Sequence, residues 1–280
     1  MTYSCRICQN QKLFKVYEQD SYHIMKCPAC GFGVLDPYPT ISEAATIYHE
    51  GYFDDKKSPD FIKDAERKFK YVDAHIPRNA RILDFGCGVG DFIGVAKSKG
   101  HELIGYDVSV FALRVVEVAY GIPTLLPPLS KQSIEPHSLD AIVAFDVIEH
   151  LPDFKETLEA FNYWLKDPTP AKTEGRVFMT MPNIDSWDTK LMGKYSYGYK
   201  KIPQHINYFS PKSISRVAHE AGFDVEEIKL WGFERSLDFV FSKLKLEGLR
   251  TLSHRLGISH LTFYYPMHDM MVHLKKSNAQ

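Results

Sequence analysis

Residues 81–91 read RILDFGCGVGD, and this stretch decides the fold of the chain. Its apolar run, residues 82–85, suits a buried strand, and a helix can begin at Asp91. Three glycines lie between them at alternating positions, from Gly86 to Gly90. Glycine adopts positive φ without steric cost and lets the backbone approach a ligand closely. The stretch therefore predicts a strand, a glycine turn and a helix, with a ligand bound beyond the carboxyl end of the strand.

The glycine spacing and the next predicted strand narrow the choice of ligand. The spacing is not the GxGxxG of dinucleotide-binding turns, and no Lys-Ser or Lys-Thr pair follows it to hold a phosphate as in a P-loop. Residues 102–106 (ELIGY) predict a second strand, which ends in Asp107. A carboxylate at that place suits the two hydroxyls of a ribose. The two motifs together favour a ligand that carries a ribose.

Taken together, these motifs resemble those of the class I S-adenosylmethionine (SAM)-dependent methyltransferases. The first motif of that family reads much like LDFGCGVGD, and an acidic residue usually closes its second strand. The resemblance covers about residues 69–230. It implies that SAM is the cofactor, with its amino-acid part at the glycine turn and its ribose on the acidic residue. The residues that it implies for cofactor binding are Asp84, Gly86, Cys87, Gly88, Gly90, Asp107, Val108, Phe145 and Asp146.

One stretch departs from the pattern of that family. Many members carry an Asp after the third strand, against the adenine amino group, whereas LLPPLSKQSIE (residues 125–135) has none. We expect Leu129, Ser130 or Lys131 to contact the adenine through backbone or aliphatic atoms instead.

Composition excludes several classes of protein. The 280 residues predict one or two domains, and a hydrophobic content of 44% is enough for a sizeable core. A net charge of −1 argues against the strong basic field of proteins that act on nucleic acid. We find no apolar run long enough to span a membrane and no apolar signal core in MTYSCRICQNQK. We therefore expect a cytoplasmic enzyme without a membrane partner.

Four of the five cysteines form two Cys-x-x-Cys pairs near the N-terminus. Such pairs can place four thiolates around zinc, each pair on a tight turn. A segment this short cannot bury a large core alone, so we expect it to fold around the metal. Four protein thiolates leave no open position, which makes the ion structural; a disulfide reading would suit a secreted protein. The predicted zinc ligands are Cys5, Cys8, Cys27 and Cys30.

The rest of the chain alternates between strand and helix patterns. That alternation predicts an α/β fold, in which a Rossmann-like, mainly parallel sheet is covered by helices on both faces. We expect a zinc ribbon over residues 1–36, a connector and capping helix over 37–78, a SAM-binding domain over 79–236 and a C-terminal helical extension over 237–280. The predicted helices are residues 60–75, 91–96, 109–120, 154–165, 211–221 and 239–249, and the strands are residues 82–85, 102–106, 139–145, 175–181 and 223–230.

A second polar segment, AFDVIEHLPD (residues 144–153), follows the fourth predicted strand. In class I methyltransferases that strand end lies beside the sulfonium and the incoming nucleophile. In a helical turn, Asp146, Glu149 and His150 would share one face. His205 lies further along the chain, in PQHINYFSP. Histidine suits general-base work because its unperturbed pKa is near neutrality. The candidate catalytic residues are His150, His205 and Asp146.

Two other interpretations of these side chains stay open. Asp146, Glu149, His150 and His205 could hold a divalent ion that lowers the pKa of a substrate hydroxyl. This set resembles one in small-RNA 2′-hydroxyl methyltransferases, and ubiquinone-pathway O-methyltransferases carry a similar segment. Alternatively, the carboxylates cap helices and the histidines pack in the core, with no role in catalysis.

Residues 183–210 form a connection too long for a simple loop, and their aromatic content argues against disorder. We interpret the segment as a lid over the substrate. Its lysines could meet a phosphate, which would fit a phosphorylated or nucleotide-linked substrate, or they could be solvated. These lysines are Lys190, Lys194, Lys200 and Lys201.

These observations predict methyl transfer to a hydroxyl of a small molecule such as a sugar, a nucleotide-sugar or a secondary-metabolite precursor. A four-cysteine ribbon before a SAM domain, with the later HINYFS stretch, resembles bacterial sugar C- and O-methyltransferases, so sugar C-methylation is an alternative. A second alternative is an RNA methyltransferase that binds nucleic acid with its ribbon. A third is a non-catalytic SAM-binding scaffold. We favour oxygen as the acceptor because the chain shows no base suited to forming a carbanion.

Overall fold

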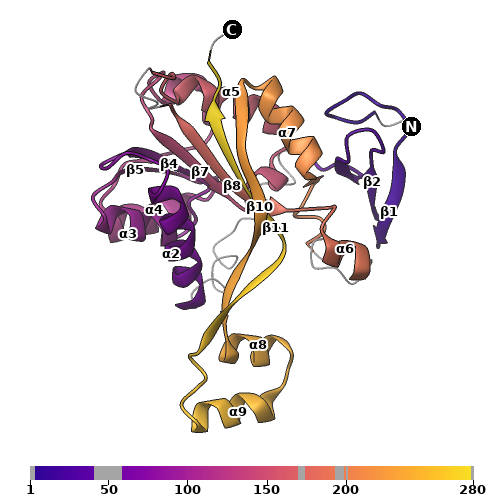
Figure 1. Cartoon of the computed structure of the whole chain (residues 1–280), viewed down its shortest axis with the longest axis vertical. Coiled ribbons are helices and arrows are strands. Elements are labelled where there is room, and N and C mark those ends of the chain that lie inside the picture. The colour runs from indigo at the N-terminus through magenta and orange to yellow at the C-terminus, as the bar shows by residue number, and fades with distance from the viewer. Residues whose placement is uncertain (1–3, 41–58, 170–173, 193–198, 200, 279–280) are drawn as a thin grey trace.

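The computed structural model describes residues 4–40, 59–169, 174–192, 199 and 201–278. These residues form a seven-stranded sheet with helices on both faces and a separate four-stranded sheet built mainly from the N-terminal segment (Figure 1). The predicted α/β class with a small N-terminal module is confirmed. Much of the predicted connector, residues 41–58, lies outside the described residues.

The central sheet has the strand order β10-β11-β8-β7-β4-β5-β6. Neighbouring strands from β8 to β6 are parallel, and β11 is antiparallel to both of its neighbours. Because β5 and β6 lie on one side of β4 and β7 and β8 on the other, the strand order reverses at β4, and ligands of such sheets bind at the carboxyl ends of the strands there. The strands are β4 (Arg81–Phe85), β5 (Glu102–Tyr106), β6 (Thr124–Leu125), β7 (Ala141–Phe145), β8 (Arg176–Pro182), β10 (Phe223–Ser236) and β11 (Thr262–Lys276).

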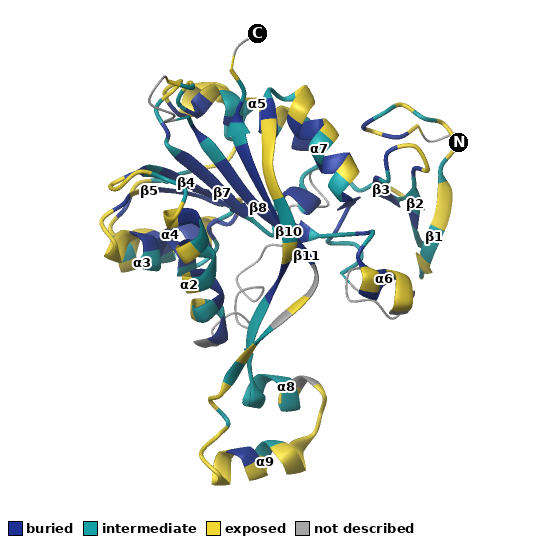
Figure 2. Ribbon diagram, in the orientation of Figure 1, coloured by how far each residue is buried: buried dark blue, intermediate teal, exposed yellow. Residues whose placement is uncertain are grey.

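Helices cover both faces of this sheet, so its central strands are buried (Figure 2). In β4, Ile82 packs in the same core cluster as α2, α3 and α4, whereas Leu83 and Phe85 pack in the cluster of α5 and α7. This alternation follows from the two-residue period of a strand. The helices are α2 (Pro59–Asp73), α3 (Asp91–Ser98), α4 (Val110–Tyr120), α5 (Phe154–Trp164) and α7 (Pro211–Glu220), close to their predicted bounds.

The N-terminal module, residues 4–36, is tied to the predicted lid. Its strands β1 (Phe14–Gln19), β2 (Tyr22–Lys26) and β3 (Gly33–Asp36) form an antiparallel sheet, completed by β9 (Asn207–Tyr208) from residues 183–210. The lid segment also contains α6 (Trp187–Met192). Residues 193–198 and 200, which include Lys194 and Lys200, lie outside the described residues.

The predicted helical extension over residues 237–280 is wrong for its last part. Only α8 (Leu237–Lys243) and α9 (Glu247–Arg255) are helical, and they are separate because the chain turns at Lys245, whose φ is +57°. The chain then returns as β11, which inserts between β10 and β8. The inner part of β11, residues 269–274, is buried on both faces, and such a stretch shows no apolar–polar alternation, so its pattern was not legible in the sequence.

The outer parts of β10 and β11 form a ribbon that projects from the sheet and carries α8 and α9 at its end (Figure 1). In α9 only Ser253 is buried, so this tip adds little to the core. None of the helices in the described ranges is both long and apolar enough to cross a membrane.

Two changes to the C-terminal part should differ strongly in their effect on thermal stability. Ending the chain after His260 should abolish cooperative thermal unfolding, because it removes the buried Met270, Val272 and Leu274 from the middle of the sheet. Replacing residues 237–261 with an Asn-Gly turn should shift the melting temperature by no more than about 5 °C. Circular dichroism measures both, and equal effects of the two changes would contradict this placement of β11.

Candidate functional site

The glycine turn after β4 needs glycine for two reasons. Gly86 and Gly90 have φ of +83° and +90°, a region that side chains disfavour. A Cβ at Gly86 would lie 2.4 Å from Val147, and one at Gly90 would lie 2.6 Å from Tyr120. The turn is held to the next strand, since the amides of Gly86 and Cys87 both donate to the Tyr106 carbonyl, at 2.7 and 2.9 Å. The predicted strand, turn and helix are all present.

Asp107 lies at the carboxyl end of β5, beside this turn. Its two carboxylate oxygens accept the amides of Gly88 and Ser109, each at 2.9 Å. These bonds fix the direction of the carboxylate. Because a carboxylate has about four lone-pair sites, it can also accept two hydroxyls of a ribose. The turn and Asp107 thus stand side by side, as the motifs predicted.

Asp84 is buried beneath the turn. Burial, together with the nearby Asp107 carboxylate, raises the pKa of Asp84 to about 8. Burial also raises the pKa of the Cys87 thiol, so this cysteine is a packed side chain rather than a nucleophile. Of the other residues predicted to contact the cofactor, Val108 is exposed and Phe145 packs against Phe92.

Asp146 directly follows β7 with a φ of +59°. Its carboxylate accepts the Thr180 hydroxyl at 2.9 Å and the Lys68 ammonium at 3.0 Å. Burial alone would raise the pKa of Asp146, but the Lys68 charge and these hydrogen bonds lower it. The carboxylate is therefore ionised and turned toward Lys68. In the described residues, Asp146 does not belong to the group of possible metal-binding side chains that includes the other three members of the predicted set.

Glu149, His150 and His205 do converge, as predicted. Glu149 and His150 lie on a single 3₁₀ turn, Ile148–His150, and His205 approaches from the lid segment. The Oε1 atom of Glu149 is 3.9 Å from His150 Nε2 and 4.0 Å from His205 Nε2. The two imidazole rings pack edge to face, with centroids 4.8 Å apart. One carboxylate oxygen and two imidazole nitrogens thus point to a common place.

Glu149 is the most perturbed member of this cluster. Its side chain is buried, and Oε2 has no hydrogen-bond partner within the described part of the chain. Burial, and then the nearby Asp146 carboxylate, raise the pKa of Glu149 well above its usual range. Burial of this kind favours the protonated, neutral form of a carboxyl over the ionised form unless a cation lies beside it.

Two charged residues of this region were missed in the sequence. Lys68 lies on α2, where one lysine among several charged residues gave no signal. Asp269 lies on β11, which was not predicted as a strand; burial and the Asp146 carboxylate raise its pKa well above its usual range. Lys201, predicted as a lid lysine, lowers the pKa of Asp146 and opposes the rise in the pKa of Glu149, so its charge lies close to this region.

The four predicted zinc ligands lie together in the N-terminal module. Their sulfur atoms lie within 4.8 Å of one another, and the Cys5–Cys30 and Cys8–Cys27 pairs are each 3.5 Å apart. The two turns match in backbone geometry. Cys5 and Cys27 each donate their amide to the carbonyl five residues on and accept the amide four residues on. All four are free thiols, which fits the tetrahedral arrangement that zinc requires.

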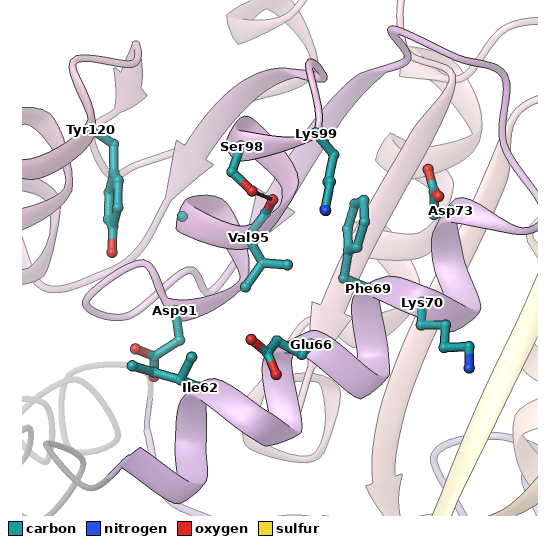
Figure 3. A pocket seen from close by; sticks show the side chains of 11 residues that line it. Ile62, Glu66, Phe69, Lys70, Asp73, Asp91, Val95, Ser98, Lys99 and Tyr120 are labelled. Carbon is teal, nitrogen blue, oxygen red and sulfur yellow. Dashed lines mark hydrogen bonds between the residues drawn. The ribbon is translucent and has the colours of Figure 1, made fainter.

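A groove of about 640 Å³ lies between α2 and α3 (Figure 3). Ile62, Glu66 and Phe69 line it from α2, and Asp91 and Val95 from α3. None of the residues predicted for cofactor binding or catalysis lines this groove. The carboxyl ends of β4, β5 and β7, rather than this groove, therefore define the candidate site.

Known proteins resemble this chain in sequence and in fold. Residues 53–228 match the family model of a methyltransferase domain. The chain is 27% identical over 171 residues to the ubiquinone biosynthesis O-methyltransferase of Nitrosospira multiformis. The aligned stretch covers 56% of this chain and 69% of the relative. The enzyme of that name from Paraburkholderia phymatum is 25% identical over 175 residues, with 58% and 72% covered.

Solved structures share the fold. The 1,6-didemethyltoxoflavin-N1-methyltransferase of Burkholderia thailandensis, solved with 1,6-didemethyltoxoflavin and S-adenosylhomocysteine, has a TM-score of 0.54 and 14% identity, covering 94% of this chain and 98% of its own. A SAM-dependent methyltransferase from Archaeoglobus fulgidus has a TM-score of 0.53 and 18% identity, covering 77% and 94%. At these identities the likeness concerns the fold.

The raised pKa of Asp84 leads to a testable pH dependence of stability. The folded protein keeps a proton on Asp84 that the unfolded chain releases above about pH 4, so this group's contribution to stability is lost as the pH rises from about 4 to 8. Asn cannot ionise. The free energy of unfolding of Asp84→Asn, relative to the unsubstituted protein, should therefore rise by about 2–4 kcal/mol between pH 5 and pH 8. Urea titrations without ligand measure this difference, and parallel pH curves would contradict it.

Proposed function

Because the chain belongs to the methyltransferase domain family, we propose that it transfers the methyl group of SAM to a hydroxyl of a small molecule. The family match confirms the resemblance drawn from the glycine and Asp107 motifs. The supporting observation is that the glycine turn, Asp107 and the Glu149–His150 turn all follow strands of one parallel set. Their side chains therefore lie at one edge of the sheet, which suits a cofactor beside an acceptor.

In the proposed reaction, the acceptor oxygen attacks the methyl carbon in line with the sulfonium. The new C–O bond forms as the C–S bond breaks, S-adenosylhomocysteine leaves, and the hydroxyl proton passes to a base. His150 suits this role, because its Nδ1 lies 2.8 Å from the Gln204 carbonyl, which can only accept. Nδ1 therefore carries the ring proton, and Nε2 holds the lone pair that accepts a proton. Alignment of the two reactants supplies most of the remaining rate.

The same cluster also suits a divalent ion. Glu149, His150 and His205 would hold it, and the ion would lower the pKa of the acceptor hydroxyl. We favour the direct base because Asp146, the second carboxylate of the predicted set, is engaged by Lys68 and Thr180. The two mechanisms require different states of Glu149. It is a neutral neighbour of the base in the direct-base mechanism and a charged ligand in the ion mechanism.

For the acceptor we propose a sugar, a nucleotide-sugar or a secondary-metabolite precursor, with Lys201 and Lys190 beside a phosphate of the substrate. The names of the curated relatives favour oxygen as the methyl acceptor. The RNA, C-methylation and scaffold alternatives gain no support from these relatives. We also propose that Cys5, Cys8, Cys27 and Cys30 bind a structural zinc ion, because their matched turns bring the four thiols together.

Cofactor binding and turnover should depend on different residues. Asp107→Ala should raise the Kd of S-adenosylhomocysteine by about 10- to 100-fold, since it removes the acceptor for the ribose hydroxyls. His150→Ala should leave that Kd within about threefold and reduce kcat by about 100- to 10,000-fold. Calorimetry gives the Kd, and transfer from radiolabelled SAM to a panel of sugars and nucleotide-sugars gives kcat. If both variants raised the Kd and lowered kcat to the same extent, the result would contradict these roles.

Glu149→Gln separates the two mechanisms. If Glu149 is neutral beside a direct base, the amide keeps its shape, and kcat should fall by no more than about fivefold. If Glu149 binds an ion, the variant should lose activity by 100-fold or more, which would overturn the direct-base mechanism. The same transfer assay, run with and without EDTA and added Mg²⁺, Mn²⁺ or Zn²⁺, measures this effect.

A further inference from the structure

We infer that the N-terminal cysteine module is a positioning unit for the transfer site. Strand β3 holds His205 and the Glu149–His150 turn in register, so metal loss from the cysteines disables methyl transfer while SAM binding persists. The inference rests on the proposed function and extends it to a part of the chain that neither binds SAM nor contributes a base.

Backbone hydrogen bonds form the first link. Ile206, next to His205, accepts the Leu35 amide from β3 at 3.0 Å and donates its own amide to the Glu149 carbonyl at 3.0 Å. The following residues extend the contact, since Val34 pairs with Asn207. One residue thus connects the cysteine module to the backbone of Glu149, and the neighbouring imidazole moves with it.

Side chains form a second link at the end of the same turn. Asn207 donates its amide to the Leu151 carbonyl at 2.7 Å and accepts the Tyr38 hydroxyl at 3.2 Å. Arg6 lies within the first cysteine turn, between Cys5 and Cys8. Its guanidinium lies 4.2 Å from the centre of the Tyr38 ring and donates to the Pro152 carbonyl at 2.9 Å.

The second cysteine turn is packed into the methyltransferase domain. Phe32 lies two residues after Cys30. The centre of its ring is 5.7 Å from that of Phe154 and 5.3 Å from that of Phe209, and all three rings are buried. The Ser210 hydroxyl, at the start of α7, donates to the Cys30 carbonyl at 3.3 Å. The second cysteine turn therefore holds the end of the segment that carries His205.

The cofactor side is held differently. Asp107 is fixed by the amides of Gly88 and Ser109, and the glycine turn by the Tyr106 carbonyl, all within the β4–β5 unit. Three short strands cannot keep their fold without a metal at the four thiols. Within the described ranges, the two-residue β9 pairs with β3 and with no other named strand, so losing β3 removes the ladder that holds it. Metal loss should therefore loosen the catalytic side of the crevice and leave the cofactor side formed.

The test uses the full-length protein, purified with its metal and then treated with a zinc chelator. Metal analysis should find one zinc per chain before treatment. After treatment, hydrogen exchange in peptides spanning residues 145–152 and 203–210 should speed up by at least about tenfold. The Kd of S-adenosylhomocysteine should stay within about threefold, and added Zn²⁺ should restore slow exchange. Absence of zinc at the outset, unchanged exchange, or loss of S-adenosylhomocysteine binding together with the metal would each overturn the inference.

A substitution that keeps the metal tests the link by itself. Asn207→Ala should reduce kcat by about 10- to 100-fold with an unchanged KM for SAM, and should speed exchange in residues 145–152. Asn162→Ala is the matched control, because Asn162 also donates its amide to a backbone carbonyl in a half-buried hydrogen bond, to Gly222 at 2.8 Å. Equal behaviour of the two variants would contradict the inference. Failure of the zinc-loaded, unsubstituted protein to bind S-adenosylhomocysteine would instead contradict the proposed function.

Discussion

The hydrogen bonds on the two sides of Ile206 are the connection on which the site depends. On one side they join β9 to the cysteine module, and on the other they join it to the carbonyl of Glu149. The parallel sheet supplies only half of a crevice, namely the glycine turn, Asp107 and the turn after β7. The other half comes from a segment far along the chain, and His205 reaches the site only because that segment pairs with β3. The seven-stranded sheet and the four-stranded sheet thus both position residues of one candidate site.

Charge is distributed unevenly along that edge. Asp146 is kept ionised by Lys68, whereas burial raises the pKa values of Asp84, Glu149 and Asp269. A site that holds several buried carboxyl groups is costly to ionise without a cation. SAM carries a positive sulfonium, which would favour the ionised forms once it binds. A cationic cofactor therefore suits the electrostatics of this edge of the sheet.

Much of this arrangement could be predicted from the sequence, for physical reasons that differ by element. The glycine turn depends on positive φ, and the cysteine turns on backbone hydrogen bonds within each turn, so short stretches were enough. The strand β11 was missed because its inner part, residues 269–274, is buried on both faces and pairs in part with β8, far away in the chain. The pairing of β9 with β3 and the ion pair of Lys68 with Asp146 depend on tertiary contacts, which leave no pattern in their own segments. For the same reason the sequence grouped Asp146 with Glu149, His150 and His205, whereas among the described residues only the last three come together as possible ion ligands.

A crystal structure with bound S-adenosylhomocysteine tests the central claim, that cofactor and base meet at the carboxyl ends of β4, β5 and β7. The account requires both ribose hydroxyls within hydrogen-bond distance of the Asp107 carboxylate, the amino-acid part against the backbone of Gly86 and Gly88, and the sulfur facing the His150–His205 pair. A ligand bound in the groove between α2 and α3, or one whose sulfur faces away from both imidazoles, would contradict it.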